Sequence, residues 1–321
     1  MNWITRWKKI GIKVKQIFKK QPLGQEATDW KNCPQCKKIS YKPDLFNNSY
    51  ICECSFHFDL PPKLRLESLF DSNYEIIEAP DNINPDPLNF EVKDGAREGY
   101  KYIDKIKKYR KITGQQTALI CANGNISGLS AVVVCFNPKF GAGRFGPAEN
   151  EHFLKAANFA VEKKVDVWIV VYQSSGIDVH TGVTGLAGMT KSIIAMNEIK
   201  KNNIPTFCVA ARATAGGTYA SSFFMHDFII IESKCVENLL FSGKRVTANI
   251  LKGTDQIPED FGTGPGVMKS GLADITLENR KELKETITKL ANIILKKENL
   301  QPSNEETIEN RESDIKVSSA S

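Results

Sequence analysis

Short apolar runs alternate with longer segments of helical periodicity from about residue 117 onward. The runs DVWIVVY, IPTFCVA and FIII, at residues 166–172, 204–210 and 228–231, predict buried strands, and residues 117–137 predict a hairpin. Apolar residues recur at helical spacing in the two segments between the strands, 150–164 and 185–203. Alternating strands and helices predict an α/β layer with right-handed crossovers.

The pattern divides the chain into four predicted parts. They are a basic segment and linker at residues 1–30, a cysteine-rich module at 31–60, one large domain at 61–300, and a polar tail at 301–321. The large domain is predicted to end in a long helix at 277–299, and the composition of the tail predicts disorder.

Charge and hydropathy narrow the class of protein. The formal net charge is +6, with much of the excess in the first twenty residues, and this suits anionic partners such as nucleotides, coenzyme A, acidic proteins or nucleic acid. No apolar run approaches the ~18 residues of a membrane span. The N-terminal segment also lacks the features of a signal peptide. A cytoplasmic protein without a membrane span is therefore expected.

Four of the eight cysteines form a module whose spacing predicts a zinc ribbon. Cys33 and Cys36 have CxxC spacing, whereas Cys52 and Cys54 are one residue closer than the usual second pair. Two thiolate pairs can complete a tetrahedral Zn²⁺ site that contributes free energy to folding. The spacing leaves the fourth ligand open between Cys54 and His57. The alternative is a degenerate ribbon that folds without metal.

Two predicted strand-to-helix junctions contain glycines that suit backbone donors. The first is the stretch 173–182 around Gly176, and the second contains Gly216 and Gly217. Glycine lets the main chain adopt positive φ and approach a ligand closely. Free amides at a helix N-terminus can then stabilise a developing oxyanion. Close packing of helix on sheet would also need small residues there. No nucleophile constellation or phosphate-binding loop accompanies these turns.

The motifs occur in an order that resembles the carboxyltransferase β subunit of bacterial acetyl-CoA carboxylase, over roughly residues 1–300. The matching stretches are MNW at the start, the cysteine module, LRLESLFD, DPLNF, FGAGRFG, the two glycine turns and FSGKRV. Thr214–Ser221 matches the family's TTGGVSAS, and Phe241–Val246 matches its FAGPRV. The resemblance implies a crotonase-like layered β-β-α superhelix with an N-terminal zinc ribbon.

Three signature places depart from the family's pattern. The first turn, SxSGGARMQE in the family, has Ser175 in place of a glycine and Asp178 in place of the arginine. The glycine-rich FMGGSMGS has become Phe140–Pro147, FGAGRFGP, and the second cysteine pair is short. A carboxylate in place of a cation would cost several kcal/mol if it were buried and unpaired.

The resemblance implies transfer of a carboxyl group from carboxybiotin to acetyl-CoA, giving malonyl-CoA for fatty acid synthesis. The amides of Gly216, Gly217 and Gly176 would be oxyanion donors, and Arg245, Gly243 and Gly143 would contact substrate. Cys33, Cys36, Cys52 and Cys54 would bind one structural Zn²⁺. Biotin would arrive on its carrier protein and would not be bound covalently here. A carboxyltransferase α subunit would complete the site in an α2β2 assembly.

Two other functions compete with this one. The departures at Ser175 and Asp178 raise the hypothesis of a paralogue that keeps the fold and the partner surface but has lost or changed the reaction. Alternatively, the ribbon and the lysine-rich start would bind nucleic acid weakly and in a salt-dependent manner, through Lys8, Lys9, Lys13 and Lys15. The sequence leaves the catalytic competence and the acyl-CoA chain length open.

Overall fold

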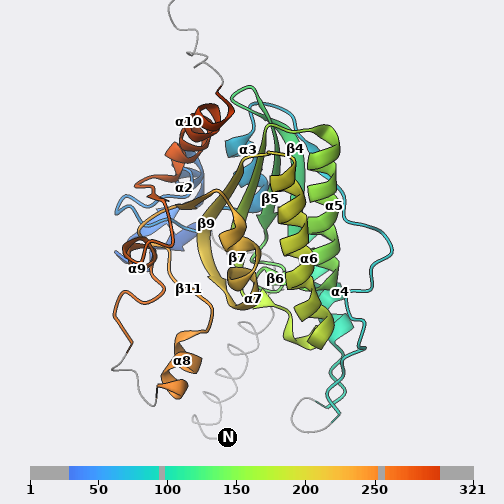
Figure 1. Ribbon diagram of the computed structural model, residues 1–321. Helices are drawn as coiled ribbons and strands as arrows, with labels where there is room; N and C mark the ends of the chain where they lie inside the picture. Colours follow the sequence, from blue (N-terminus) through green and yellow to red (C-terminus); the bar gives the residue numbers. More distant parts are fainter. Residues whose placement is uncertain (1–28, 94–97, 252–256, 297–321) are drawn as a thin grey trace, which may run out of the picture.

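The computed structural model describes residues 29–93, 98–251 and 257–296, and Figure 1 shows their arrangement. An eight-stranded mixed sheet lies at the centre, in the order β12-β10-β9-β7-β5-β4-β3, with β11 added beside β9. The strands are β3 (Glu75–Ile77), β4 (Leu119–Ile126), β5 (Leu129–Phe136), β7 (Val167–Ser174), β9 (Thr206–Ala215), β10 (Phe228–Ile231), β11 (Leu239–Leu240) and β12 (Ile275–Thr276).

The predicted hairpin and strands are confirmed. β4 and β5 pair antiparallel, with Leu119 opposite Phe136 and Ile126 opposite Leu129. From β5 to β12 the neighbouring strands are parallel, as crossover helices require. The strand predicted at residues 204–210 was too short, because β9 continues past Ala210 to Ala215. Its last residues, Thr214 and Ala215, pair with β11 and lead directly into the second glycine turn.

Helices cover both faces of the sheet, so two apolar clusters form its core (Figure 1). α5 (Pro147–Lys163) and α6 (Gly182–Lys201) pack on one face, where Phe153 and Met196 meet Trp168. α3 (Pro62–Leu69) and α10 (Leu283–Leu295) cover the other face, where Leu66 and Ile287 meet Ile169. Trp168 and Ile169 are adjacent in β7 and point to opposite faces, which is the period-two pattern of a strand buried on both sides.

The other elements of the large domain are short, apart from α4, and connect the strands of the sheet and the helices that cover it. They are α4 (Tyr102–Thr113), β6 (Arg144–Phe145), β8 (Gly176–Ile177), η1 (Val179–Thr181), α7 (Gly216–Ala220), η2 (Ser222–Met225), α8 (Lys244–Ile250), α9 (Gly264–Lys269) and η3 (Arg280–Glu282). The helix predicted over 277–299 begins only at Leu283, after η3. None of the helices within the described ranges has the length and apolar character to cross a bilayer.

The cysteine module consists of β1 (Trp30–Asn32), β2 (Ile39–Tyr41) and α2 (Lys42–Asn47), with loops that carry the cysteines. A buried charge cluster joins it to the large domain. Glu232, at the end of β10, forms ion pairs with Arg65 of α3 and Arg280 of η3. Arg280 also donates to the carbonyl oxygen of Phe58 at 2.8 Å. The module is therefore anchored to the sheet through buried side chains.

Candidate active site and metal centre

The two glycine turns lie against each other at the carboxyl ends of β7 and β9. Gly176 has φ +100° and Gly216 has φ +60°, conformations that favour glycine. A Cβ on Gly176 would lie 2.6 Å from the carbonyl oxygen of Ala215, and a Cβ on Gly216 would lie 3.7 Å from the Cα of Gly176. The turns thus meet main chain to main chain, with no room for a side chain on Gly176.

A third glycine-rich segment joins the same place. Gly143, just before β6, has φ +67°, and a Cβ there would lie 1.9 Å from the carbonyl oxygen of Gln173. Ser174 Oγ donates to the carbonyl oxygen of Gly143 at 2.6 Å and lies 3.1 Å from Thr218 Oγ1 of α7. The structure therefore brings together Gly143, Gly176 and the Gly216 turn, which lie far apart in the sequence.

The predicted donor amides differ in their surroundings. Gly216 and Gly217 are the first two residues of α7, so their N–H groups have no acceptor within that helix. The N–H of Gly176 instead donates to Ser174 Oγ at 3.1 Å. A ligand that accepts from Gly176 would have to replace this bond, whereas Gly216 and Gly217 stand at the start of a helix.

The carboxylate at position 178 is buried but paired. Asp178 Oδ2 lies 3.3 Å from Arg144 Nη2 and accepts from the hydroxyl of Tyr102 at 2.6 Å, while Oδ1 lies 2.9 Å from His180 Nδ1. The cost expected for an unpaired buried carboxylate therefore does not arise. Sequence reasoning missed Arg144 and Tyr102, because their link to Asp178 has no signature in local spacing.

The other histidine near the second turn has a structural role. His226 is buried, and its Nε2 lies 3.1 Å from the hydroxyl of Tyr172. Burial lowers the pKa of His226 to about 3, so its ring is neutral at physiological pH. His226 is therefore a hydrogen-bonded structural residue.

Gly243 and Arg245 lie apart from the meeting point of the turns. Gly243 is the N-cap of α8, and Arg245 belongs to its first turn, with a side chain outside what the structure describes. A mostly apolar cavity of about 440 Å³ separates α8 and α9 from α7, and Tyr219, Leu240 and Thr247 are among its lining residues. No pattern in the sequence indicated this cavity.

A larger cavity of about 630 Å³ lies between the cysteine module and the large domain. Pro34 and Gln35 line one side, and Arg212 and Lys234 line the other. Arg212 is the seventh residue of β9, so the cavity borders the strand that leads to the second glycine turn.

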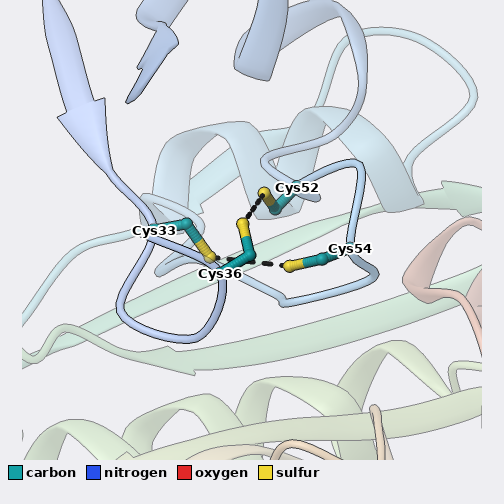
Figure 2. Close-up of side chains that lie close together, drawn as sticks. All are labelled: Cys33, Cys36, Cys52 and Cys54. Atoms are coloured by element: carbon teal, nitrogen blue, oxygen red, sulfur yellow. Dashed lines mark hydrogen bonds between the residues drawn. The ribbon is translucent and has the colours of Figure 1, made fainter. Parts of the chain in front are cut away.

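The four cysteines of the module converge on one point (Figure 2). Their sulfur atoms all lie within 4.8 Å of one another, with Cys33 and Cys54 Sγ 3.6 Å apart and Cys36 and Cys52 Sγ 3.7 Å apart. A tetrahedral Zn²⁺ with bonds of about 2.3 Å requires sulfur atoms about 3.8 Å apart. The thiol set therefore fits a zinc ion, even with the shortened second pair.

The structure places the two candidates for a fourth ligand in different surroundings. Cys54 belongs to the sulfur cluster, whereas His57 is buried with its Nδ1 3.9 Å from Glu232 Oε1. Although burial acts to raise the pKa of Cys33, the backbone N–H groups of Cys36 and Gln35 outweigh it and lower this pKa to about 7. Cys33 thus forms a thiolate readily, which is the form that binds metal.

The large domain, which contains the glycine turns, matches a known protein family. A carboxyl transferase domain matches residues 103–319. The chain belongs to the carboxyl transferase family. The match covers the hairpin, both glycine turns and the helices between them, so the resemblance predicted from the motifs is confirmed.

Curated relatives of this carboxyl transferase extend the match to the cysteine module. The acetyl-coenzyme A carboxylase carboxyl transferase subunit beta of Pelagibacter ubique (strain HTCC1062) is 32% identical over 99% of this chain and 100% of its own length. The protein of the same name from Sinorhizobium medicae (strain WSM419) is 28% identical over 92% of this chain and 93% of its own.

Solved structures show the same fold. The transcarboxylase 12S structure with hydrolysed methylmalonyl-coenzyme A bound superposes with a TM-score of 0.57 at 18% identity, over 72% of this carboxyl transferase and 41% of that chain. The Pseudomonas malonate decarboxylase MdcD-MdcE hetero-dimer superposes with a TM-score of 0.54 at 16% identity, over 84% of this chain and 96% of that chain.

Metal analysis can test the four-cysteine site of this carboxyl transferase. We expect Cys54→Ser to weaken Zn²⁺ binding at least about 100-fold, because a hydroxyl is a poor replacement for a thiolate ligand. The matched variant His57→Asn should keep its metal through dialysis against a chelator. Loss of zinc from His57→Asn, with zinc retained by Cys54→Ser, would contradict the assignment.

Proposed function

We propose that the chain is the carboxyl transferase β subunit of an acetyl-CoA carboxylase and forms malonyl-CoA. It would transfer a carboxyl group from carboxybiotin, carried on its carrier protein, to the methyl carbon of acetyl-CoA. The proposal rests on the contact between Gly176 and Gly216. This contact occurs in a chain that matches a protein of that name over 99% of its length.

The residues of this chain would act on the thioester. The ureido nitrogen of biotin, once its carboxyl group has left, would accept a proton from the acetyl methyl group. The thioester carbonyl then becomes an enolate oxygen, which needs donors in a fixed position until its methylene carbon takes up the carboxyl group. The N–H groups of Gly216 and Gly217, at the start of α7, meet that need and bring the positive end of a short helix. Carboxybiotin, when bound, supplies the carboxyl group.

Finer assignments follow from the same proposal. We assign residues 31–60 to a zinc ribbon and 61–300 to a domain of crotonase-like superhelical type. Arg245, Gly243 and Gly143 are proposed to contact substrate, and one Zn²⁺ is proposed at the four cysteines. The basic residues 1–28, which carry the nucleic-acid hypothesis, lie outside the described residues.

Reconstitution tests the proposed reaction. The chain is purified together with the carboxyltransferase α subunit, and malonyl-CoA is measured after carboxylated carrier protein and acetyl-CoA are added. We expect malonyl-CoA to form only when the α subunit, the carboxylated carrier protein and acetyl-CoA are all present. A stable complex without malonyl-CoA would reject the proposal and favour the paralogue that has lost or changed the reaction.

An exposed apolar stripe supports a partner that covers α6. Val183, Leu186 and Ile194 are 72%, 57% and 51% exposed, and their spacing places them along one side of α6. Val179, which is 83% exposed, precedes them in η1. A stripe of this kind typically marks an interaction site. We propose that the α subunit docks there, where it would border the Gly176 turn.

Charged substitutions on the stripe test the docking surface. We expect Val183→Lys combined with Leu186→Lys to weaken the α-subunit complex about 100-fold, because two apolar contacts are replaced by desolvated ammonium groups. Ile293→Lys is the matched control, since Ile293 is 73% exposed on α10, across the sheet from α6. Equal affinities for the two variants, measured by titration, would contradict the assignment.

A further inference from the structure

The first glycine turn is attached along its length to the segment that precedes α5. β6 and β8 pair in parallel, with Arg144 beside Gly176 and Phe145 beside Ile177. The N–H of Ser175 donates to the carbonyl oxygen of Ala142 at 2.9 Å. The position of Gly176 opposite Gly216 therefore depends on where β6 lies.

Arg144 is the centre of a buried cluster that fixes this attachment. Its Nη1 donates to the hydroxyl of Tyr102 at 2.8 Å, and its Nη2 donates to Glu149 Oε2 at 3.0 Å and lies 3.3 Å from Asp178 Oδ2. These side chains come from α4, α5, β6 and the residue before η1. One guanidinium thus joins the first turn to two helices.

The cluster is arranged so that each polar group has a defined role. Tyr102 accepts from Arg144 and donates to Asp178, and burial raises the pKa of its hydroxyl, so that it keeps its proton. Glu149 also accepts from the N–H of Gly146 at 3.0 Å and of Ala118 at 3.0 Å. Among the described residues, Arg144 is the only lysine or arginine within ion-pair distance of Asp178 or Glu149.

The cation of this cluster lies at a different position from the one in the family pattern that the sequence resembles. The pattern that the sequence resembles has arginine where this chain has Asp178, and serine where it has Arg144. In this chain the carboxylate is on the turn and the guanidinium is on the strand beside it, and the two are in contact. The two departures therefore compensate each other in charge.

We propose that Arg144 and Asp178 form a positioning pair that holds Gly176 against Gly216, with the cation moved from the turn to β6. Neither residue touches the reacting atoms. The effect of this pair on the reaction rests on the proposed function. Its effect on the position of the Gly176 turn is independent of that function.

A double-mutant cycle read by hydrogen exchange tests the pair on the isolated chain. Arg144→Ser leaves two buried carboxylates without a cation, and Asp178→Arg leaves two cations with one carboxylate. We expect each single variant to speed amide exchange in residues 174–182 at least about 10-fold. The double variant Arg144→Ser/Asp178→Arg should return to within about 3-fold of wild type, since one cation again faces Glu149.

Further variants separate positioning from general destabilisation. Arg280→Ser removes a buried arginine at the cysteine module and should leave exchange at 174–182 unchanged. Tyr102→Phe removes only the hydroxyl that joins Arg144 to Asp178, so it tests the same segment if Arg144→Ser does not fold. Additive effects in the double variant, or wild-type exchange at 174–182 in Arg144→Ser and Tyr102→Phe, would overturn the proposal.

Turnover in the complex with the α subunit gives a second measurement. Arg144→Ser should lower kcat at least about 10-fold with the KM for acetyl-CoA nearly unchanged, and the double variant should recover most of kcat. A wild-type complex that forms no malonyl-CoA would reject the proposed function, while the exchange cycle would still decide whether the pair holds the turn.

Discussion

Gly176→Ala is expected to lower malonyl-CoA formation about 100-fold or more, because a displacement of about 1 Å between reacting groups has an effect of this size. The new Cβ would lie 2.6 Å from the carbonyl oxygen of Ala215, so the two turns must separate. The positive φ of Gly176 adds strain in a residue with a side chain. The measurement is kcat in the complex with the α subunit, together with the melting temperature of the variant.

Gly128→Ala is a matched control for this effect. Gly128 has φ +78° in the β4–β5 hairpin, and nothing lies within 4 Å of a Cβ placed on it. It should therefore show the backbone strain, roughly 1 kcal/mol, without the collision. Equal losses of kcat in Gly176→Ala and Gly128→Ala would show that contact between the turns does not matter for the reaction.

Glu232→Gln is expected to have the largest effect on stability. It leaves Arg65 and Arg280 buried without their shared carboxylate, and breaking a buried ion pair in this way costs about 3–5 kcal/mol. The free energy of unfolding in urea measures the loss. Glu278→Gln is the control, because Glu278 is 69% exposed in its pair with Lys234 and should contribute less than about 1 kcal/mol.

The same cluster predicts how stability depends on pH. Burial acts to raise the pKa of Glu232, but Arg65 and Arg280 outweigh it and lower this pKa from 4.5 to about 2. Because the folded pKa is the lower one, the contribution of about 3 kcal/mol is present above pH 4.5 and is lost as pH falls toward 2. The difference in stability between wild type and Glu232→Gln should shrink over that interval. A constant difference would contradict this account.

Much of the sheet could be predicted from the sequence because its strands are continuous apolar runs. Residues 167–172 and 229–231 are buried on both faces, and the hairpin at 117–137 reverses at Ser127–Gly128. The end of β9 could not be predicted in this way. Its last residues, Arg212 to Ala215, include polar side chains, and Thr214 and Ala215 are held by pairing with the distant Leu239 and Leu240.

The candidate site could be predicted only in its glycines. The two turns are visible as local patterns, but their contact depends on the parallel pairing of β7 with β9, which local sequence does not encode. Along the chain, Asp178 lies 34 residues after Arg144 and 76 residues after Tyr102, so only the fold brings the three side chains together. The choice of Cys54 over His57 likewise depended on Glu232, which lies beside His57 in space but not in sequence.

The close approach of main chain to Gly143 and Gly176 has a consequence for how variation would map onto this protein. At these positions the main chain itself occupies the space, so no side chain is tolerated and none is needed. In a saturation scan of the gene, the most intolerant positions near the site should be those where all nineteen replacements fail alike. A search that ranks residues by the chemistry of their side chains would pass over them.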